Sequence, residues 1–323
     1  MKAPTQDDVA RAAGVSRTLV SRALRGSGRV SASNRARILA VAARLGYRPN
    51  EAAVSLASAR SGVIGVILPN IRNPFYDAVS EGLRRAAAAA SQTTVFTISG
   101  QDRGAALEQA DHFMRLRATG LIMVAPNLGD AELCQLAEQT PLTLIGRAPA
   151  GGRVDSVRID ERRAAHIIMR ALASRGYRKV VPVAPHWSML DPTGHERQLA
   201  LISEAEAHGF SWNQVTADGS GATLRSLVAP GTAMIVHNDI LAIDVVAAVV
   251  ASGLRLGSDV AVVSYDNTYL AARAEFSLTS IDQSPARLGS RAVELLLSRV
   301  ADPHGPPRDE LVEPRLEVRG SLH

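Results

Sequence analysis

The first 47 residues place apolar residues at the spacing of short amphipathic helices. Thr5 and Asp8 form the pattern of a capping box and predict the start of the first helix. Gly14 predicts its end, and Ser16 is a favourable N-cap for a second helix over residues 17–25. Two short helices joined by a tight glycine turn predict a helix-turn-helix.

A third helical run follows the loop after the second helix. Ser31 or Ser33 is suited to cap it, and Gly46 predicts its end. The three predicted helices share one small apolar core, so we expect an all-α helix-turn-helix head over residues 1–47. Residues 48–60 are expected to form a hinge helix or linker.

From residue 61 onward, short β-branched runs alternate with amphipathic helical stretches, the pattern of parallel sheets covered by helices. The predicted strands are residues 63–68, 94–98, 120–124, 142–145, 179–183, 233–236 and 260–263. They fall into two sets, which predict an α/β body of two lobes. The expected boundaries are about 61–159 and 286–310 for lobe 1, and about 160–285 and 311–323 for lobe 2. Since open parallel sheets bind ligands beyond the carboxyl ends of their strands, a cleft is expected between the lobes.

Composition points to a soluble globular protein, with 46% apolar and 21% charged residues in a chain of 323. No run approaches the ~18 apolar residues of a membrane helix, and carboxylates at Asp7 and Asp8 stand where a signal peptide would be apolar. We therefore expect a cytoplasmic protein without a membrane partner. The single cysteine excludes a scaffold held by internal disulfides.

Charge is distributed unevenly along the chain. Residues 1–60 hold eleven basic and three acidic residues, a net charge of +8, whereas the whole chain carries +5. A basic head on a slightly acidic body favours binding to a polyanion, because each neutralised phosphate releases condensed counterions. The alternative is an ordinary arginine-rich surface in contact with water.

The second helix of a helix-turn-helix enters the major groove, and its first residues reach the base edges. Arg17, Thr18, Ser21 and Arg22 occupy these positions. An arginine can donate two hydrogen bonds to guanine, and a threonine can contact thymine or a phosphate. Each arginine could equally contact a phosphate without reading the sequence.

Three segments of the head carry a specific signature: DVARAAGVS at 8–16, VSR at 20–22 and LGYRPN at 45–50. In these segments the chain resembles the lac-repressor type, or LacI/GalR, family of bacterial transcription regulators. The resemblance implies a homodimer that reads a pseudo-palindromic operator in double-stranded DNA. The residues expected to contact DNA are Thr5, Ser16, Arg17, Thr18, Ser21, Arg22, Arg29, Asn50 and Leu56.

In this family the segment after the head is a hinge helix that packs against its dimer mate. The matching stretch is residues 50–58, with Leu56 as the expected wedge in the minor groove. A helix of about nine residues is shorter than the ~12–15 residues needed for stability alone, so it should fold only when DNA and a partner helix supply contacts. A plain linker is the alternative.

The resemblance extends across the body through NPFY at 73–76, HND at 237–239 and SYDN at 264–267, and it implies a periplasmic-binding-protein-like body. It places a small effector among Phe75, Tyr76, Asp160, Arg197, Asn238, Asp266 and Gln283. These side chains suit a hydroxyl-rich or anionic molecule: carboxylates accept hydroxyl donors, a guanidinium group holds vicinal oxygens or a carboxylate, and an aromatic ring covers a ring face.

Structural roles are the alternative for the same residues. Arg197 and Asp266 could form ion pairs or caps, Asn238 could cap the following helix, and Phe75 could belong to the core. The chain also has Gly146 where relatives commonly carry aspartate. A hexose is therefore one candidate effector among sugars, polyols, sugar acids and nucleosides, and both induction and co-repression fit the sequence.

Enzymatic motifs are missing from the sequence. Neither lysine, Lys2 or Lys179, lies in a phosphate-binding loop, and His195-Glu196 lacks the second histidine of a zinc-protease motif. We therefore expect no catalytic residue, cofactor or metal. The prediction is an effector-controlled, nucleoid-associated repressor. The alternatives are a solute-binding protein, which would need an export signal and no basic head, and a sugar-modifying enzyme, which would need catalytic residues.

Overall fold

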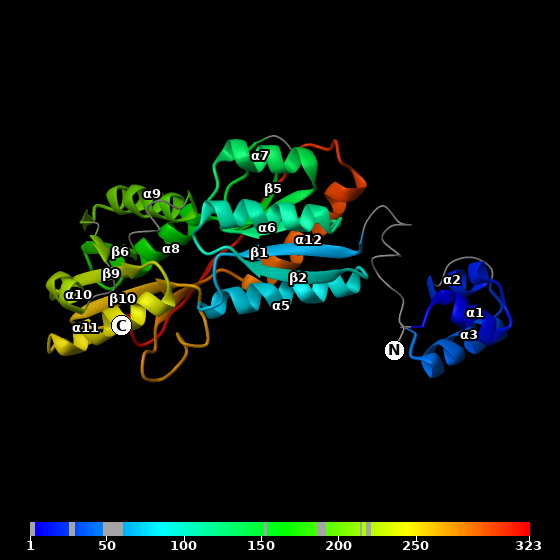
Figure 1. Cartoon of the computed structure of the whole chain (residues 1–323). Helices are drawn as coiled ribbons and strands as arrows, with labels where there is room; N and C mark the ends of the chain where they lie inside the picture. The colour runs from blue at the N-terminus through cyan, green and yellow to red at the C-terminus, as the bar shows by residue number, and fades with distance from the viewer. Residues whose placement is uncertain are drawn as a thin grey trace. The chain divides into compact units, whose positions relative to one another are not determined.

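The computed structural model describes residues 4–25, 30–47, 61–151, 154–185, 192–213, 215–217 and 221–323. The chain forms two compact units, residues 1–61 and 62–323 (Figure 1). The first unit is helical, and the second contains the sheets.

The helical unit consists of α1 (Gln6–Ala13), α2 (Arg17–Arg25) and α3 (Ala32–Leu45). The predicted capping box is confirmed, because Thr5 Oγ1 accepts a hydrogen bond from the Asp8 amide while the Asp8 carboxylate accepts one from the Thr5 amide. The core of this unit is made of Val9, Ala10, Ala13, Val20, Ala23, Ile38, Val41 and Ala42.

Glycine ends both α1 and α3, as predicted. Gly14 and Gly46 adopt the left-handed conformation, with φ of 64° and 66°, which glycine reaches without steric cost. Ser31 is the residue that caps α3: its hydroxyl accepts a hydrogen bond from the Asn34 amide at 3.3 Å. Local sequence signals therefore set the ends of these helices.

The first sheet of the body contains six strands, each described pair of which is parallel. In spatial order they are β12 (Asp309–Val312), β5 (Asp155–Ile159), β4 (Leu142–Ile145), β3 (Gly120–Val124), β1 (Val63–Leu68) and β2 (Thr93–Ile98). On one face lie α5 (Pro74–Ala89) and α12 (Pro285–Ala301), and on the other α6 (Arg103–Arg115) and α7 (Asp130–Gln139). Side chains along β1 point alternately to the two faces of the sheet, so both faces are covered by helices. Ile64 and Val66 face α5 and α12, whereas Ile67 faces α6.

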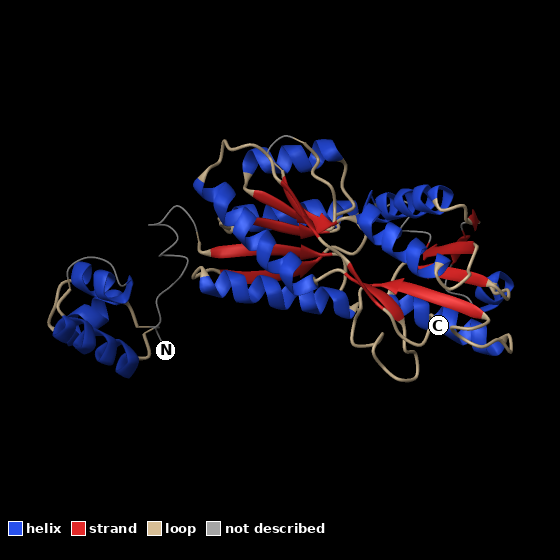
Figure 2. Cartoon of the chain, turned by 180° about the vertical axis from the view of Figure 1, so that it is seen from behind, coloured by secondary structure: helices blue, strands red, loops and turns tan. Residues whose placement is uncertain are grey.

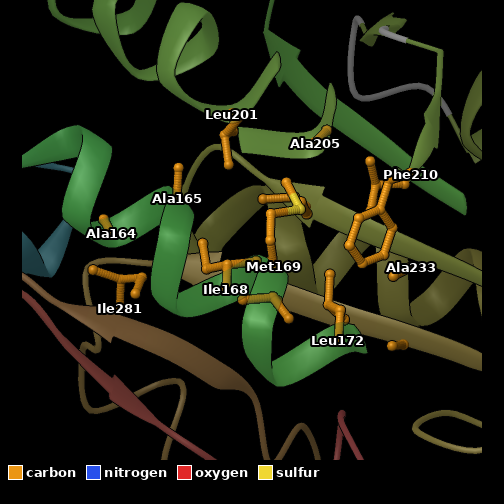
Figure 3. Close-up of a cluster of buried hydrophobic side chains, with 14 of the residues drawn as sticks. Ala164, Ala165, Ile168, Met169, Leu172, Leu201, Ala205, Phe210, Ala233 and Ile281 are labelled. Carbon is orange, nitrogen blue, oxygen red and sulfur yellow. The ribbon is translucent and has the colours of Figure 1, made fainter. Parts of the chain in front are cut away.

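The second sheet contains seven strands. They are β13 (Arg315–Glu317), β11 (Thr279–Asp282), β10 (Val260–Tyr265), β9 (Thr232–Val236), β6 (Lys179–Pro185) and β7 (Ser211–Trp212) in order, with β8 (Val215–Ala217) also paired to β6. Figure 2 shows the strands of the body as two separate groups of red arrows. One face is covered by α8 (Glu161–Ala173) and α9 (Pro192–Ala207), and the other by α10 (Gly221–Leu227) and α11 (Asp239–Ala251). Side chains from α8, α9 and the sheet meet in one cluster (Figure 3). Among the described helices, none is long and apolar enough to cross a membrane.

Within the described residues the chain passes between the two sheets three times. The passages lie between β5 and α8, between β11 and α12, and between β12 and β13. Two of them lead directly into helices, and the residues there occupy special positions: Asp160 caps α8, and Ser284 before α12 has a φ of 51°. These three passages join the two lobes, and each begins at the end of a strand, β5, β11 or β12.

Helices α5 and α12 pack closely through two glycines. A Cβ atom on Gly82 would overlap the backbone oxygen of Ala286, and one on Gly289 would overlap that of Val79 and lie 2.8 Å from the Leu83 amide nitrogen. Because the atoms that face each glycine belong to the backbone of the other helix, a side chain at either position would force the two helices apart. These glycines set how closely the two helices of lobe 1 approach.

Replacing Gly289 with alanine should lower the free energy of unfolding by about 1–3 kcal/mol, because the added methyl group forces α12 away from α5. Gly104→Ala is the matched control, since a Cβ at that exposed position on α6 would lie 3.3 Å from the side-chain oxygen of Asp102 and meet no backbone of another helix, and alanine favours the helix. Urea unfolding followed by circular dichroism measures both variants. Equal midpoints for Gly289→Ala and the wild-type protein would contradict the close-packing argument.

Candidate functional site

The face of α2 that points away from the core carries the residues expected to contact DNA. Positions 17, 18, 21 and 22 follow the helical spacing of one side, whereas Val20 and Ala23 are buried on the other. Arg17, Thr18 and Arg22 are exposed, and Ser21 is half-buried. The helix therefore presents two arginines and two hydroxyl groups together to the solvent.

Two further DNA candidates have local roles in the head. Ser16 precedes α2, and its hydroxyl accepts a hydrogen bond from the Leu19 amide at 3.3 Å. Thr5 is exposed at the start of α1, where its hydroxyl also donates to the Asp8 carboxylate at 2.7 Å. Arg17 Nε lies 3.8 Å from Asp7 Oδ1, and both side chains are exposed, so water weakens this pair and leaves Arg17 available to a phosphate. The remaining candidates, Arg29, Asn50 and Leu56, lie outside the described residues.

A cavity of about 390 Å³ lies between the two lobes of the body, within the range of small-molecule sites. Part of its lining comes from the ends of strands in both sheets, such as Val124 at the end of β3 and His237 after β9. Of the seven residues expected around an effector, those that line it are Phe75, Tyr76, Arg197, Asn238, Asp266 and Gln283.

Asp160 is the seventh expected residue, and it is not among those that line the cavity. Its carboxylate accepts a hydrogen bond from the Arg163 amide at 2.9 Å and caps α8. The next residue, Glu161, lines the cavity instead. The reason is geometric: the chain turns from β5 into α8 at this point, so Asp160 faces its own helix and Glu161 faces the space between the lobes.

Arg197 is buried and paired with Glu161. Its Nε and Nη2 donate to Glu161 Oε1 at 3.0 and 2.8 Å, and its Nη1 donates to the backbone oxygen of His237 at 3.0 Å. The guanidinium carbon also lies 3.9 Å from the centroid of the Tyr265 ring. Burial by itself disfavours the charge, but the adjacent Glu161 carboxylate outweighs this and raises the pKa of Arg197. The ion pair that was the alternative for Arg197 is therefore present.

A chain of hydrogen bonds continues from this ion pair to the other lobe. Arg197 Nη2 donates to Gln283 Oε1 at 3.3 Å, Gln283 Nε2 donates to Asp266 Oδ1 at 2.6 Å, and Asn73 Nδ2 donates to Asp266 Oδ2 at 2.7 Å. Asn73 belongs to lobe 1, where it caps α5, whereas Arg197 and Asp266 belong to lobe 2. The polar floor of the cavity therefore links the lobes directly.

Asp266 has a perturbed pKa and a strained backbone. Burial raises the pKa of its carboxyl group to about 7, although the hydrogen bond from Asn73 acts in the opposite direction. Its φ of 101° lies in the region that favours glycine. The backbone is held there by its own amide, which donates to Ile281 O at 3.0 Å, and by the next amide, of Asn267, which donates to Ser280 Oγ at 2.9 Å.

The segment after β9 combines helix capping with cavity lining. Asn238 Oδ1 accepts a hydrogen bond from the Leu241 amide at 2.9 Å and so caps α11, while the residue also lines the cavity. Desolvation, together with the charge of Arg197, lowers the pKa of His237 to about 3, which keeps its ring neutral. Asp239 is buried and accepts hydrogen bonds from Ser264 and other groups of the β10–β11 region, a structural role.

Phe75 and Tyr76 form an aromatic pair at the start of α5. Their ring centroids are 5.5 Å apart and their planes meet at 73°, an edge-to-face arrangement. Both side chains are half-buried, line the cavity and also pack against the lobe 1 core. The core role and the cavity role therefore coexist.

The sequence did not predict four charged residues that line the cavity: Arg72, Arg158, Glu161 and Glu196. Arg158, at the end of β5, donates to Glu196 on α9 at 2.5 Å and makes two hydrogen bonds to Asp309, at 3.0 and 2.7 Å. This is a second polar link between the lobes. Arg72 also lines the cavity and is exposed. No one-dimensional pattern signals the Arg158 cluster, because Asp309 lies 151 residues away in the chain.

Replacing Asp266 with asparagine should change how stability depends on pH. The folded wild-type protein binds this proton more tightly than the unfolded chain, whose aspartate pKa is about 3.9. The contribution of Asp266 to stability is therefore complete below about pH 4 and is lost as the pH rises through about 7, by up to about 4 kcal/mol. Urea unfolding at several pH values between 5 and 8 should show the wild-type protein losing stability relative to Asp266→Asn. Parallel curves would contradict the raised pKa.

Comparison with known proteins agrees with both parts of the chain. The family model described as bacterial regulatory proteins, lacI family, matches residues 5–50, and the periplasmic binding protein-like domain matches residues 169–322. Catabolite control protein A of Priestia megaterium is 28% identical over 301 residues, which cover 90% of each chain. The HTH-type transcriptional repressor PurR of Aliivibrio salmonicida is 26% identical over 336 residues, which cover 99% of each. Both relatives are named for regulation rather than for an enzymatic reaction.

Solved structures confirm the predicted fold class. The lac repressor dimer bound to operator and the anti-inducer ONPF matches with a TM-score of 0.87 at 24% identity, covering 100% of both chains. The transcriptional regulator CelR in complex with cellobiose matches with a TM-score of 0.71 at 25% identity, covering 98% of this chain and 99% of that one. The resemblance found in the sequence is confirmed: residues 5–50 match the lacI family of bacterial regulatory proteins, and the chain is a DNA-binding transcriptional regulator.

Proposed function

We propose that this regulator is a cytoplasmic, nucleoid-associated repressor that binds a pseudo-palindromic operator as a homodimer. A small effector that enters the cleft lowers or raises its affinity for the operator. The observation that carries the proposal is the cavity between the lobes, whose polar residues hydrogen-bond across it. A ligand there meets residues of both lobes at once. It can therefore favour one lobe arrangement over another by differential binding. Binding without turnover is part of the proposal.

The exposed face of α2 is the proposed reading surface. It presents Arg17, Thr18, Ser21 and Arg22 on one side of a helix. The net charge of +8 over residues 1–60 supports phosphate contacts that position the head. Base contacts from the first turns of α2 would then supply specificity. The expected contacts of Arg29, Asn50 and Leu56 complete this proposal.

An exposed edge strand supports the homodimer. Within the part of the chain that the structure describes, β2 pairs with β1 alone, and Val95, Phe96 and Ile98 are exposed on it. An edge strand with apolar side chains is a natural surface for self-association, because monomers seldom leave one uncovered. Two copies joined here would bring two heads to one operator, as a pseudo-palindrome requires.

The charges in the cleft favour a neutral, hydroxyl-rich effector over an anion. The donors of Arg197 bond to Glu161, His237 and Gln283, and those of Arg158 bond to Glu196 and Asp309. An anionic group would have to displace these carboxylates. A polyol could instead share the remaining acceptors of Asp266 and neighbouring amides, with the Phe75 and Tyr76 rings against its apolar face.

Replacing Arg22 with alanine should weaken operator binding by about 1–3 kcal/mol if the guanidinium group contacts a base, with a smaller loss on random DNA. The operator is first recovered by sequencing genomic fragments bound by the purified chain at two salt concentrations. Arg85→Ala is the matched control, since this exposed arginine lies on α5 of the body and pairs with Glu81. Equal losses for Arg22→Ala on operator and random DNA would reduce Arg22 to a phosphate contact. Equal effects of both variants would contradict the role of α2.

Calorimetric titration with neutral sugars, polyols, sugar acids and phosphorylated sugars tests the effector class. A neutral compound should bind and change operator affinity, and Gln283→Ala should weaken that binding because the amide is part of the cavity floor. Arg72→Ala separates the alternatives, since this exposed arginine is the cavity residue best able to meet an anion. A sugar acid that binds tightly, and loses affinity in Arg72→Ala, would overturn the neutral effector.

A further inference from the structure

Two histidines and a glutamate lie close together at helices α8 and α9 in lobe 2. His166 lies on α8 and Glu204 on α9, and His208 directly follows α9, where its amide donates to the Glu204 backbone oxygen at 3.1 Å. One ligand atom from each residue lies within 4.8 Å of the other two. We propose that these three side chains form a binding site for a divalent transition-metal ion such as Zn²⁺. The proposal is independent of DNA and effector binding.

The spacing and packing of the two helices hold the three side chains in place. Glu204 and His208 are four residues apart, so they project from the same side of the helical turn. Buried residues adjacent in sequence to two of them, Ala165 beside His166 and Ala205 beside Glu204, belong to the cluster that joins α8 and α9 to the sheet (Figure 3). The backbone positions of the ligands are therefore fixed by a packed core.

The distances already approach those of a coordination sphere. His166 Nδ1 lies 3.0 Å from Glu204 Oε2, and His208 Nδ1 lies 3.7 Å from the same oxygen. A tetrahedral ion with bonds of about 2.0–2.2 Å separates its ligand atoms by roughly 3.3–3.6 Å, so small side-chain rotations suffice. His208 Nδ1 also lies 2.9 Å from the Glu204 backbone oxygen. A hydrogen bond there places the proton on Nδ1 and orients the ring, so Nε2 is the nitrogen of His208 that would bind the ion.

The donor set selects the class of ion. Two imidazole nitrogens and one carboxylate oxygen suit Zn²⁺, Co²⁺ or Ni²⁺, whereas Mg²⁺ and Ca²⁺ prefer oxygen alone. The side chains are 35% (His166), 13% (Glu204) and 24% (His208) exposed, so an ion can enter from solvent. A depression beside His166, lined in part by Arg163 and Arg170, leaves room for water or an anion as a further ligand.

A metal here would join two helices that also form the effector cleft. Glu161 begins α8 five residues before His166, and Arg197 lies on α9 seven residues before Glu204. At 1.5 Å per residue, these are distances of about 7.5 and 10.5 Å along the helices. The ion would therefore hold α8 and α9 together one to two turns from the Glu161–Arg197 pair, and it should stabilise lobe 2.

Titration of the tag-free, chelator-treated full chain with ZnCl₂ tests the site. We expect one Zn²⁺ per chain, and a loss of affinity of about tenfold or more in His166→Ala and in His208→Ala. His112→Ala is the matched control, because this exposed histidine lies on α6 outside the cluster. MgCl₂ should give no saturable binding.

The visible absorption of bound Co²⁺ supplies a second readout. It reports metal coordination directly, so it would not appear if the three side chains only stabilised the fold. Co²⁺ should give visible ligand-field bands in the wild-type protein and in His112→Ala, and these should be lost in the His166→Ala/His208→Ala double variant. Circular dichroism establishes that this double variant is folded. Equal Zn²⁺ binding by the wild-type protein and the double variant would overturn the proposal, and so would absence of binding at micromolar Zn²⁺, which would leave the cluster as hydrogen bonds alone.

Discussion

In both sheets of the body, neighbouring strands pair almost entirely in parallel, so each strand requires a crossover that returns the chain to the opposite end of the sheet. Helices must then cover both faces, and the strands become continuous apolar runs such as Gly120–Val124. Because parallel strands run in the same direction, the residues that follow them all lie at the carboxyl end of each sheet. Where these ends of the two sheets face each other, these residues line a single cavity.

The cavity floor shows how two lobes with separate cores can respond as a unit. Glu161, Arg197, Gln283, Asp266 and Asn73 form one chain of polar contacts from lobe 2 to lobe 1. Buried polar groups are costly when they lose a partner, so a ligand must replace each contact that it displaces. Affinity and lobe arrangement are thereby coupled, which is the physical requirement for effector control.

Burial separates the charged groups of this protein by role. The pair Arg197–Glu161 is almost fully buried. The guanidinium group of Arg197 already donates to Glu161 and to the His237 backbone oxygen, so it does not serve to bind an anionic ligand. Arg17 and Arg22 on α2 are exposed, and water weakens the pair of Arg17 with Asp7, so both arginines remain available to a polyanion. The cluster of His166 and Glu204 is intermediate: ordered by packed helices, yet open to ions from solvent.

The sequence by itself determined the local elements and the family. The Thr5–Asp8 capping box, the glycine ends of the head helices and the apolar strands of both sheets are set by neighbours within a few residues. Strands rich in polar residues, such as Asp155–Ile159 and Asp309–Val312, were missed because pairing with distant strands makes them strands: β5 pairs with β4 and β12. Tertiary structure alone decided that Glu161 rather than Asp160 faces the cavity, that Arg197 is already paired, and that Arg158 meets Asp309. The reason is that these outcomes depend on contacts between residues distant in the chain and on the turn from sheet to helix, which local spacing does not encode.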